Sequence, residues 1–358
     1  MSGPALVSAP DGRGVASSRV LPWGSGAVVS VDLGPLDLVS GGRLPGVVMA
    51  YRHDGLAPAD GPQVVVVHAL TGSADAAGDW WEPLIGAGRA LDTDRYGVLC
   101  ANLLGGRYGT TGPTSVDPRT GTPWADRFPA VSTRDQAAAM WRLLDAIGID
   151  RVALVTGGSL GGMVAQEVAL LQPARVDRLL PMAAPAATGP MAVAWNRIQA
   201  VLIERLGDEG LALARQLAMT TYRSEADFEH RFGRERQPDG RFSVISYLDY
   251  QGVKLVERFD GDTYRILAGA MDRHDIGDGR GGLSAALGAL ALSGTRLTAL
   301  GIEDDILYGP RQVRVLADTA AAAGVRSRYR ELRSTKGHDA FLVEWDQLDT
   351  VIREALAD

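Results

Sequence analysis

Apolar and polar positions follow two different patterns along the first half of the chain. Residues 27–33 and 45–55 alternate between apolar and polar positions, which is typical of antiparallel strands with one covered face. Residues 63–70, 96–106 and 151–158 are apolar at nearly every position, which favours strands covered on both faces. The sequence therefore predicts a sheet that begins with antiparallel strands and has a buried centre.

Between the second and third buried segments, apolar residues recur at helical spacing, at Met140, Leu143, Leu144 and Ile147. A helix that alternates with buried strands in this way is typical of a parallel sheet with helices on its faces. The chain therefore belongs to the α/β class.

The pattern changes near residue 186, where successive helical segments follow one another without a buried strand. A strand, a helix, a strand and a helix return after about residue 294. We expect a sheet core, a helical insertion and a loose N-terminal tail, which span residues 25–185 with 295–358, residues 186–294 and residues 1–24, respectively.

Composition narrows the class of function. The 358 residues carry a net charge of -7, so we expect neither nucleic acid nor an anionic membrane as a partner. The N-terminus lacks the pattern of a secretory signal, and the apolar window 283–302 contains polar residues, so we expect a cytoplasmic protein. Cys100 is the single cysteine, which excludes a thiolate metal cluster, and we expect it to be a core residue.

Ser159 lies in "GGSLG", directly after a predicted strand and before a predicted helix. This G-x-S-x-G pattern is typical of a sharp turn that exposes a nucleophilic serine. Side chains at the two outer positions of the pattern would clash with neighbouring elements, which explains the glycines. The amide of Leu160, at the start of the helix, can stabilise negative charge beside the serine.

A serine nucleophile needs a base, and five histidines are available. In this strand–turn–helix context the base follows the serine and the acid along the chain, which leaves His230, His274 and His338. The first two lie in the helical insertion, where we expect surface or capping roles. His338 lies in a loop after the last strand, at the edge of the sheet that carries Ser159, and is the predicted base.

The orienting acid is expected after the strand that ends near residue 302, where Glu303, Asp304 and Asp305 follow one another. Spacing alone does not show which of the three is the orienting acid. The second oxyanion donor is expected from the amide of Leu70, and His68 is expected to order that loop without titrating.

Residues 277–282, "GDGRGG", fit a dinucleotide-binding pattern but follow a helical segment. No βαβ unit surrounds them, so we do not expect a nucleotide site there.

Taken together, the motifs resemble the homoserine O-acetyltransferase family of α/β-hydrolase-fold acyltransferases. The resemblance runs from about residue 45 to 357 and includes "VHALTGSADAAGDWWEPLIG", "FPAVSTRDQ", "GGSLGGM", "ALARQLAMTTYRS", "SYLDYQGVKLVERFDGDTYRIL", "DILYGPRQ" and "GHDAFLVE". It implies an α/β-hydrolase fold, with a mostly parallel sheet, helices on both faces and an inserted lid. It also implies acetyl-CoA as donor substrate, no permanently bound cofactor, no metal and a homodimer formed through the lid.

The resemblance further implies a residue for each role. It assigns Ser159 as nucleophile, Asp305 as the orienting acid and His338 as the base. By motif, Arg215, Tyr222 and Asp339 would bind the carboxylate and ammonium groups of an amino-acid acceptor. The expected acceptor is L-homoserine. A cation and an anion at fixed separation suit such a zwitterion.

Because of two departures from the family pattern, the identity of the acceptor substrate stays undetermined. The lid lacks roughly a dozen residues after its first helix, and Arg107 occupies a position where cysteine is common. Serine or a specialised-metabolite alcohol is an alternative acceptor, and succinyl is an alternative acyl group. A serine hydrolase is the alternative of another class, because water can resolve the same acyl-enzyme.

Overall fold

The computed structural model describes residues 6–8 and 23–357, and for residues 6–8 it describes only the backbone. The strands are β1 (Leu6–Ser8), β2 (Val28–Asp32), β3 (Leu36–Asp37), β4 (Arg43–Leu44), β5 (Val48–Gly55), β6 (Gln63–Val67), β7 (Gly97–Ala101), β8 (Val152–Gly158), β9 (Arg178–Met182), β10 (Arg296–Ile302) and β11 (Ser327–Leu332). The α-helices are α1 (Thr133–Ala146), α2 (Leu160–Leu171), α3 (Pro190–Leu206), α4 (Asp208–Tyr222), α5 (Glu225–Phe232), α6 (Ser243–Val256), α7 (Gly261–Asp272), α8 (Leu283–Ser293), α9 (Pro310–Ala322) and α10 (Trp345–Ala357).

Within the described residues, nine strands form one sheet in the order β1-β2-β5-β7-β6-β8-β9-β10-β11. β5 runs antiparallel to β2 and β7, and the neighbours from β7 to β11 are parallel, so the predicted arrangement of strands is confirmed. β1 pairs with β2 although we expected residues 1–24 to be a loose tail. Residues 1–5 and 9–22 of that segment lie outside the described residues.

The central strands are covered on both faces, and successive residues point to opposite sides. Val65 and Val67 of β6 pack into the apolar cluster that contains α1 and α2. Val64 and Val66 pack into the cluster that contains Trp81 and α10. Complete burial on two faces explains why these strands are apolar at nearly every position.

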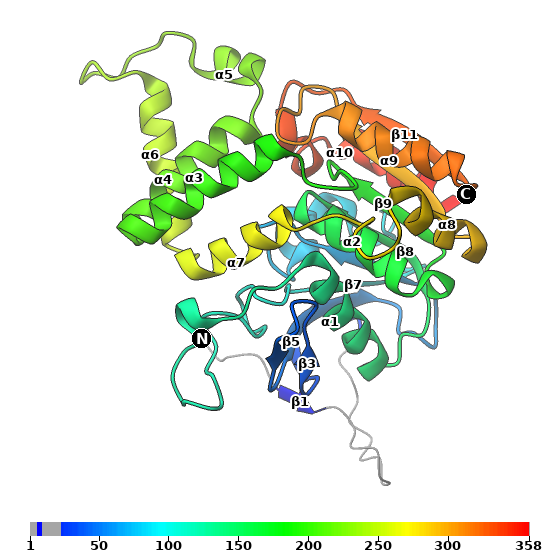
Figure 1. Ribbon diagram of the computed structural model, residues 1–358. Coiled ribbons are helices and arrows are strands. Elements are labelled where there is room, and N and C mark those ends of the chain that lie inside the picture. The colour runs from blue at the N-terminus through cyan, green and yellow to red at the C-terminus, as the bar shows by residue number, and fades with distance from the viewer. Residues whose placement is uncertain (1–5, 9–22, 358) are drawn as a thin grey trace.

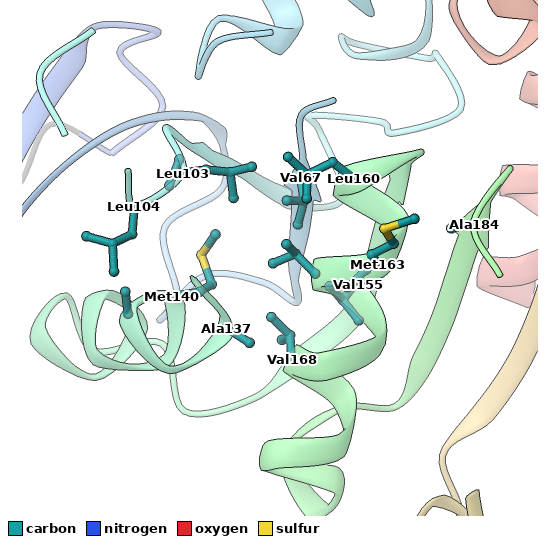
Figure 2. Close-up of a cluster of buried hydrophobic side chains, with 14 of the residues drawn as sticks. Val67, Leu103, Leu104, Ala137, Met140, Val155, Leu160, Met163, Val168 and Ala184 are labelled. Atoms are coloured by element: carbon teal, nitrogen blue, oxygen red, sulfur yellow. The ribbon is translucent and has the colours of Figure 1, made fainter. Parts of the chain in front are cut away.

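Figure 2 shows how α1 and α2 cover one face of the sheet. Met140 of α1 and Met163 of α2 lie beside Val67 and Val155 of the strands. Cys100 belongs to the cluster on the opposite face and is buried, which confirms the prediction of a core residue. Burial raises the pKa of its thiol, so it is poorly suited to act as a nucleophile.

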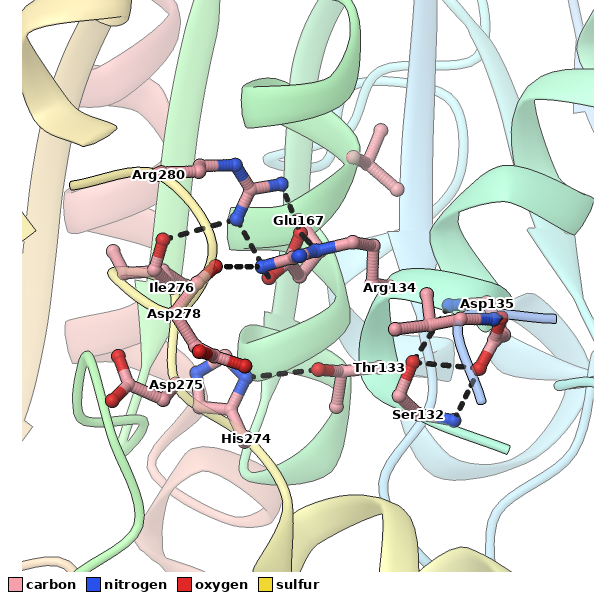
Figure 3. A network of polar contacts seen from close by, with 12 residues as sticks. Ser132, Thr133, Arg134, Asp135, Glu167, His274, Asp275, Ile276, Asp278 and Arg280 are labelled. Carbon is pink, nitrogen blue, oxygen red and sulfur yellow. Dashed lines mark hydrogen bonds and ion pairs between the residues drawn. The ribbon is translucent and has the colours of Figure 1, made fainter. Parts of the chain in front are cut away.

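The connection between α7 and α8 is held against the core by a buried carboxylate (Figure 3). Glu167 of α2 accepts from Arg280 at 2.6 Å and from Arg134 of α1 at 3.3 Å. Arg134 also donates to the carbonyl of Asp278 at 2.8 Å. The glycine-rich segment 277–282 therefore links a helix to a helix, and its arginine has a structural role.

Helices α3 to α7 pack together at one end of the sheet (Figure 1), and we propose that they form the lid. α8 lies apart from them and packs against α2 and α9 of the core. The interval 186–294, which we expected to be lid throughout, thus contains one core helix, and we propose that the lid ends before α8.

The shortened first part of the lid is a tight pair of helices, because α3 and α4 are joined by Gly207 alone. Gly207 has a φ of 59°, which favours glycine. A β-carbon on Gly210 would lie 2.0 Å from the carbonyl oxygen of Leu202, so the helices approach too closely there for a larger residue. Glycine at both positions allows α3 and α4 to pack side by side without a longer loop.

Candidate active site

Ser159 lies between β8 and α2, in the turn that the G-x-S-x-G pattern predicts. Its φ of 56° and ψ of -126° fall in a region that residues with side chains rarely occupy. The Ser159 amide donates a hydrogen bond of 2.9 Å to the carbonyl of Met182, at the end of β9. The strained turn therefore places the serine at the carboxyl ends of the parallel strands, with 5% of the residue exposed.

The glycines around Ser159 leave no space for side chains. A β-carbon on Gly157 would lie 2.4 Å from the carbonyl oxygen of Val67, and one on Gly161 would lie 2.1 Å from the same atom. A β-carbon on Gly158 would lie 2.3 Å from the ring of Phe341. The prediction that the motif requires glycine at its outer positions is confirmed.

His338 and Asp305 meet at the same edge of the sheet. Nδ1 of His338 lies 2.7 Å from a carboxylate oxygen of Asp305, and both residues are buried. The other oxygen of Asp305 accepts from the amides of Leu307 and Tyr308 at 2.8 and 3.0 Å, which fixes the carboxylate. An Nδ1–H donated to Asp305 leaves Nε2 as the basic atom of the ring.

The structure distinguishes the three acids that spacing left open. Glu303 and Asp304 are exposed in the turn after β10, whereas 4% of Asp305 is exposed. Only Asp305 among the three contacts a histidine. The turn amides that bind its carboxylate belong to Leu307 and Tyr308, so the fold of this turn determines which way Asp305 points.

Aromatic rings surround the imidazole of His338. The rings of Tyr222, Tyr308 and Phe341 have centroids 5.8, 5.5 and 5.5 Å from it. Because Phe341 also lies against Gly158, His338 is close to the Ser159 turn. Nε2 of His338 is buried and has no hydrogen-bond partner among the described residues. This is the ring atom that could receive a proton from Ser159.

Two opposing effects determine the pKa of His338. Burial lowers this pKa, whereas the charge of Asp305 and the hydrogen bond to it raise the pKa, and the net pKa lies above the ordinary value. Such a pair is suited to general base catalysis, because the carboxylate stabilises the imidazolium that forms during the reaction.

The amides of Leu70 and Leu160, the two expected oxyanion donors, have no backbone acceptor among the described residues. Leu160 is the first residue of α2, so its amide has no acceptor within the helix. Leu70 follows β6, and its amide donates to no acceptor among the described residues. The side chains of both residues are buried.

His68 orders the loop that carries Leu70. The amide of Leu103 donates to its Nε2 at 3.1 Å, and its Nδ1 lies 2.7 Å from the carbonyl of Ala69. Burial lowers the pKa of His68 to about 4, so the ring is neutral near pH 7. The prediction that His68 orders this loop without titrating is confirmed.

The lid also contacts this loop through Arg258, which lies two residues beyond the end of α6. Its guanidinium donates to the carbonyl of Thr71 at 2.7 Å, next to Leu70. The hydroxyl of Tyr108 donates to the carbonyl of Arg258 at 2.9 Å, and Arg107 lies 3.3 Å from Asp260. The unusual Arg107 is therefore part of a polar connection between the lid and the loops at the mouth of the site.

The three residues implied for acceptor binding lie around His338. The Tyr222 ring is a neighbour of the imidazole, and the Arg215 guanidinium carbon is 5.4 Å from the centre of the Tyr222 ring. Arg215 forms no ion pair with any described residue, and its Nε is buried and without a partner. Asp339 lies 3.2 Å from Arg223, a contact that the sequence reasoning missed.

The pKa of Asp339 is raised by burial, against the opposing effects of Arg223 and Arg215. Two charged groups therefore lie near His338: Arg215 of the lid, which has no ion-pair partner among the described residues, and Asp339 of the His338 loop, which is paired with Arg223 of the lid.

A second group of charges that the sequence reasoning missed anchors the His338 loop. Asp227 of α5 is buried, and one of its oxygens accepts from Lys336 at 3.0 Å. Its other oxygen lies 3.7 Å from Arg223. Lys336 and Asp339 flank His338 in sequence, so the lid holds the loop on both sides of the base. Charged residues in "YRSEAD" and "TKGHD" were the available signal, but their pairing is not readable from the sequence.

The two histidines of the insertion have different environments. His230 is exposed, as expected. The expectation of a surface or capping role is wrong for His274, which is buried between Thr133 and the carbonyl of Pro185, at 3.0 and 3.2 Å. Burial lowers the pKa of His274 to about 4, so it serves as a neutral bridge between the core and the end of α7.

A cleft of about 640 Å³ opens beside the site. Ala69, Thr71 and Leu342 line its core side, and Arg215 and Lys254 line its lid side. A small acceptor and the end of a longer donor could therefore reach the region of Leu70. In the part of the chain that the structure describes, no helix has the length and apolar character needed to cross a bilayer.

Comparisons with known proteins agree with this architecture. Residues 62–274, more than half of the chain, match the family model described as alpha/beta hydrolase fold. In overall structure the chain is similar to the homoserine O-acetyltransferase from Bacillus anthracis, with a TM-score of 0.85 at 23% identity over 93% of this chain and 98% of that one. It is also similar to esterase E22, with a TM-score of 0.84 at 21% identity over 92% and 99%. At these identities the similarity concerns the fold.

Closer relatives were found by sequence. The homoserine O-acetyltransferase of Thermus thermophilus is 43% identical, over 87% of this chain and 86% of that protein. The one from Moorella thermoacetica is 38% identical, over 97% of this chain and 98% of that protein. Because these relatives match along nearly the whole length, the chain belongs to the homoserine O-acetyltransferase family, within the proteins of the alpha/beta hydrolase fold.

Proposed function

We propose that this protein transfers the acetyl group of acetyl-CoA to the hydroxyl of L-homoserine through an acetyl-Ser159 intermediate. The names of its relatives support the overall reaction. The observation that carries the mechanism is the 2.7 Å contact between His338 and Asp305, buried beside the strained Ser159 turn.

In the first half-reaction, Nε2 of His338 takes the proton of the Ser159 hydroxyl while the serine oxygen attacks the thioester carbonyl carbon. The carbonyl oxygen becomes an oxyanion, which accepts hydrogen bonds from the amides of Leu70 and Leu160. When this intermediate collapses, the carbon–sulfur bond breaks and the imidazolium protonates the CoA thiolate. Asp305 stabilises the imidazolium and keeps Nδ1 protonated throughout.

In the second half-reaction, His338 takes the proton of the acceptor hydroxyl, and the acceptor oxygen attacks the acetyl-serine. The intermediate collapses with cleavage of the serine–acetyl bond, and the imidazolium returns the proton to Ser159. The unpaired Arg215 suits the acceptor carboxylate, and Asp339 suits the ammonium group. The hydroxyl of Tyr222 would complete the binding site beside His338.

Hydrolysis is the competing outcome, and the similarity in fold to an esterase gives it a specific basis. Transfer prevails if the acceptor is held close and water is excluded. The low exposure of Asp305, His338 and Ser159, between 3% and 5%, favours exclusion of water from the base.

Release of free thiol from acetyl-CoA distinguishes these reactions. We expect slow release without acceptor, a large increase with L-homoserine, and the appearance of O-acetylhomoserine in equal amount. Serine and succinyl-CoA serve as comparison substrates. Equal thiol release with and without homoserine would identify a hydrolase, and faster release with serine would change the proposed acceptor.

Arg215→Ala should weaken acceptor binding selectively. Loss of a charge-assisted hydrogen bond costs about 1.5–3 kcal/mol, so we expect the KM for homoserine to rise about ten- to hundredfold and the KM for acetyl-CoA to change little. Steady-state kinetics with each substrate varied in turn measures both values. Arg205→Ala, an exposed lid arginine, is the matched control. A parallel rise of the two KM values would contradict the assignment.

We further propose that two copies associate through the lid. Large apolar side chains are exposed on α3 and α6, at Met191, Ile198, Leu206, Tyr250 and Val253, with exposed fractions of 45–62%. Exposed apolar groups gathered on one part of a molecule are typical of an interface. Sedimentation equilibrium should give twice the chain mass of 37.9 kDa, and a monomer at micromolar concentration would contradict the proposal.

A further inference from the structure

A pair of buried polar side chains joins two helices of the lid. Tyr264 of α7 and Gln199 of α3 have only 1% and 3% of their surfaces exposed. The hydroxyl of Tyr264 donates a hydrogen bond to the side-chain oxygen of Gln199. Helices α3 and α7 also pack against α4, which ends at Tyr222, beside the base (Figure 1). The mechanism proposed above uses neither Tyr264 nor Gln199.

The orientation of the Gln199 amide follows from its second contact. Its Nε2 donates to the carbonyl of Trp195 at 3.2 Å, one turn earlier in α3. Only the nitrogen of an amide side chain carries hydrogens, so the nitrogen faces this carbonyl and the oxygen faces Tyr264. Because an amide oxygen can only accept, the single proton of the Tyr264 hydroxyl is directed to Gln199.

The hydroxyl of Tyr264 also forms a hydrogen bond with the hydroxyl of Tyr222. Since the proton of Tyr264 is directed to Gln199, its oxygen accepts the proton of Tyr222. Burial raises the pKa of both phenols, so both keep their protons near pH 7. The proton of Tyr222 therefore points to Tyr264, and a lone pair of the Tyr222 oxygen is left for another donor.

The groups around Tyr222 indicate which donor this lone pair suits. The guanidinium of Arg215 lies over the face of the Tyr222 ring, and the imidazole of His338 is a neighbour of the same ring. The charge of Arg215 lowers the pKa of Tyr222 and that of Asp339 raises it, so both charges act on this hydroxyl. An oxygen that only accepts can bind an ammonium group, which has three donors, but not a carboxylate, which has none.

We propose that Tyr264 and Gln199 are positioning residues, which orient the Tyr222 hydroxyl so that its oxygen accepts from the ammonium group of the acceptor. The inference rests on the proposed transfer to an amino acid. It adds a means by which the site distinguishes an amino acid from a hydroxy acid without an ammonium group. Neither Tyr264 nor Gln199 needs to contact the acceptor, and the chemistry at Ser159 needs neither of them.

Kinetics with L-homoserine and 4-hydroxybutyrate tests the proposal, because the second compound has the same hydroxyl and carboxylate but no ammonium group. Tyr264→Phe should raise the KM for L-homoserine about three- to tenfold, the effect of one hydrogen bond, with little change in kcat or in the KM for acetyl-CoA. The affinity for 4-hydroxybutyrate, measured as a substrate or competitive inhibitor, should stay close to the native value.

Two further variants accompany Tyr264→Phe. Gln199→Met keeps both tyrosine hydroxyls but removes the acceptor of the Tyr264 proton, so Tyr264 can donate to Tyr222 and reverse its orientation. It should show the same selective rise of the KM for L-homoserine. Tyr96→Phe is the matched control, because Tyr96 is a half-buried tyrosine that precedes β7, at the edge of the sheet opposite the active site. It should keep native kinetics.

The double variant Tyr222→Phe/Tyr264→Phe separates orientation of Tyr222 from a merely structural role. Once the hydroxyl of Tyr222 is absent, Tyr264→Phe should have no further effect on the KM for L-homoserine. Additive effects in the double variant, or an equal loss of affinity for L-homoserine and 4-hydroxybutyrate, would overturn the inference and leave the proposed transfer intact. Thiol release by the native protein that does not respond to L-homoserine would instead overturn the proposed function.

Discussion

Ser159→Ala is expected to lower kcat for acetyl transfer by about 10⁶-fold, close to the effect of removing a nucleophilic serine from other triads. The reason is that no other hydroxyl lies in the strained turn above β8, between the amide of Leu160 and the base. The measurement is thiol release and acetyl-homoserine formation at saturating concentrations of both substrates.

Ser284→Ala provides the control, because Ser284 is exposed on the core helix α8. This variant should keep full activity. Circular dichroism and Tm of Ser159→Ala should match those of the native protein, since the substitution removes a single oxygen atom. If Ser159→Ala kept more than about 1% of kcat, Ser159 would not be the nucleophile.

Asp305→Asn is expected to lower kcat by about 10⁴-fold, which is the cost of a wrong tautomer of the base in a comparable triad. An amide can donate to Nδ1, so the ring would carry its proton on Nε2 and could not accept the serine proton. The amides of Leu307 and Tyr308 can still bind the side-chain oxygen, so the fold should survive.

Asp304→Asn is the matched control, because Asp304 is adjacent in sequence but exposed. It should keep native activity, and a large loss there would mean that the wrong acid has been assigned.

The pH dependence provides a further check on Asp305. His338 must be neutral to act, so kcat/KM should fall as the pH falls through a pKa above 6.5. The two larger effects that raise this pKa come from Asp305, so in Asp305→Asn the imidazole should titrate at lower pH. Titration of the ring by NMR measures this shift, and an unchanged pKa would show that Asp305 does not act on His338.

The sequence predicted those residues of the site that lie in loops directly after the strands. In a parallel sheet the loops after β6, β8, β10 and β11 share one edge, so Leu70, Ser159, the acidic turn and His338 could be assigned to it without coordinates. The choice of Asp305 depends on which side chain the turn after residue 302 buries. That is a property of the folded turn, which explains why spacing left three acids open.

The contacts between lid and core were not predictable in the same way. Asp227 with Lys336, and Arg223 with Asp339, join segments more than a hundred residues apart in sequence. The sequence gives no indication of the partner of a charged residue. Asp227, Lys336 and Arg223 were therefore assigned no role, and Asp339 was assigned only to the ammonium group of the acceptor.

Two further differences have a physical origin. A helix of an insertion can pack on either domain, so the absence of strands before residue 295 could not show that α8 joins the core. A histidine in a polar segment, such as His274, can be buried when two hydrogen bonds satisfy its ring. In both cases tertiary packing determined the outcome.

Mass spectrometry of the protein after incubation with acetyl-CoA alone tests the central claim most directly. The account predicts an acetyl group on the peptide that contains Ser159, its loss on addition of L-homoserine with formation of O-acetylhomoserine, and its absence in Ser159→Ala. An enzyme that forms O-acetylhomoserine at the native rate while Ser159 never carries the acetyl group would contradict the account.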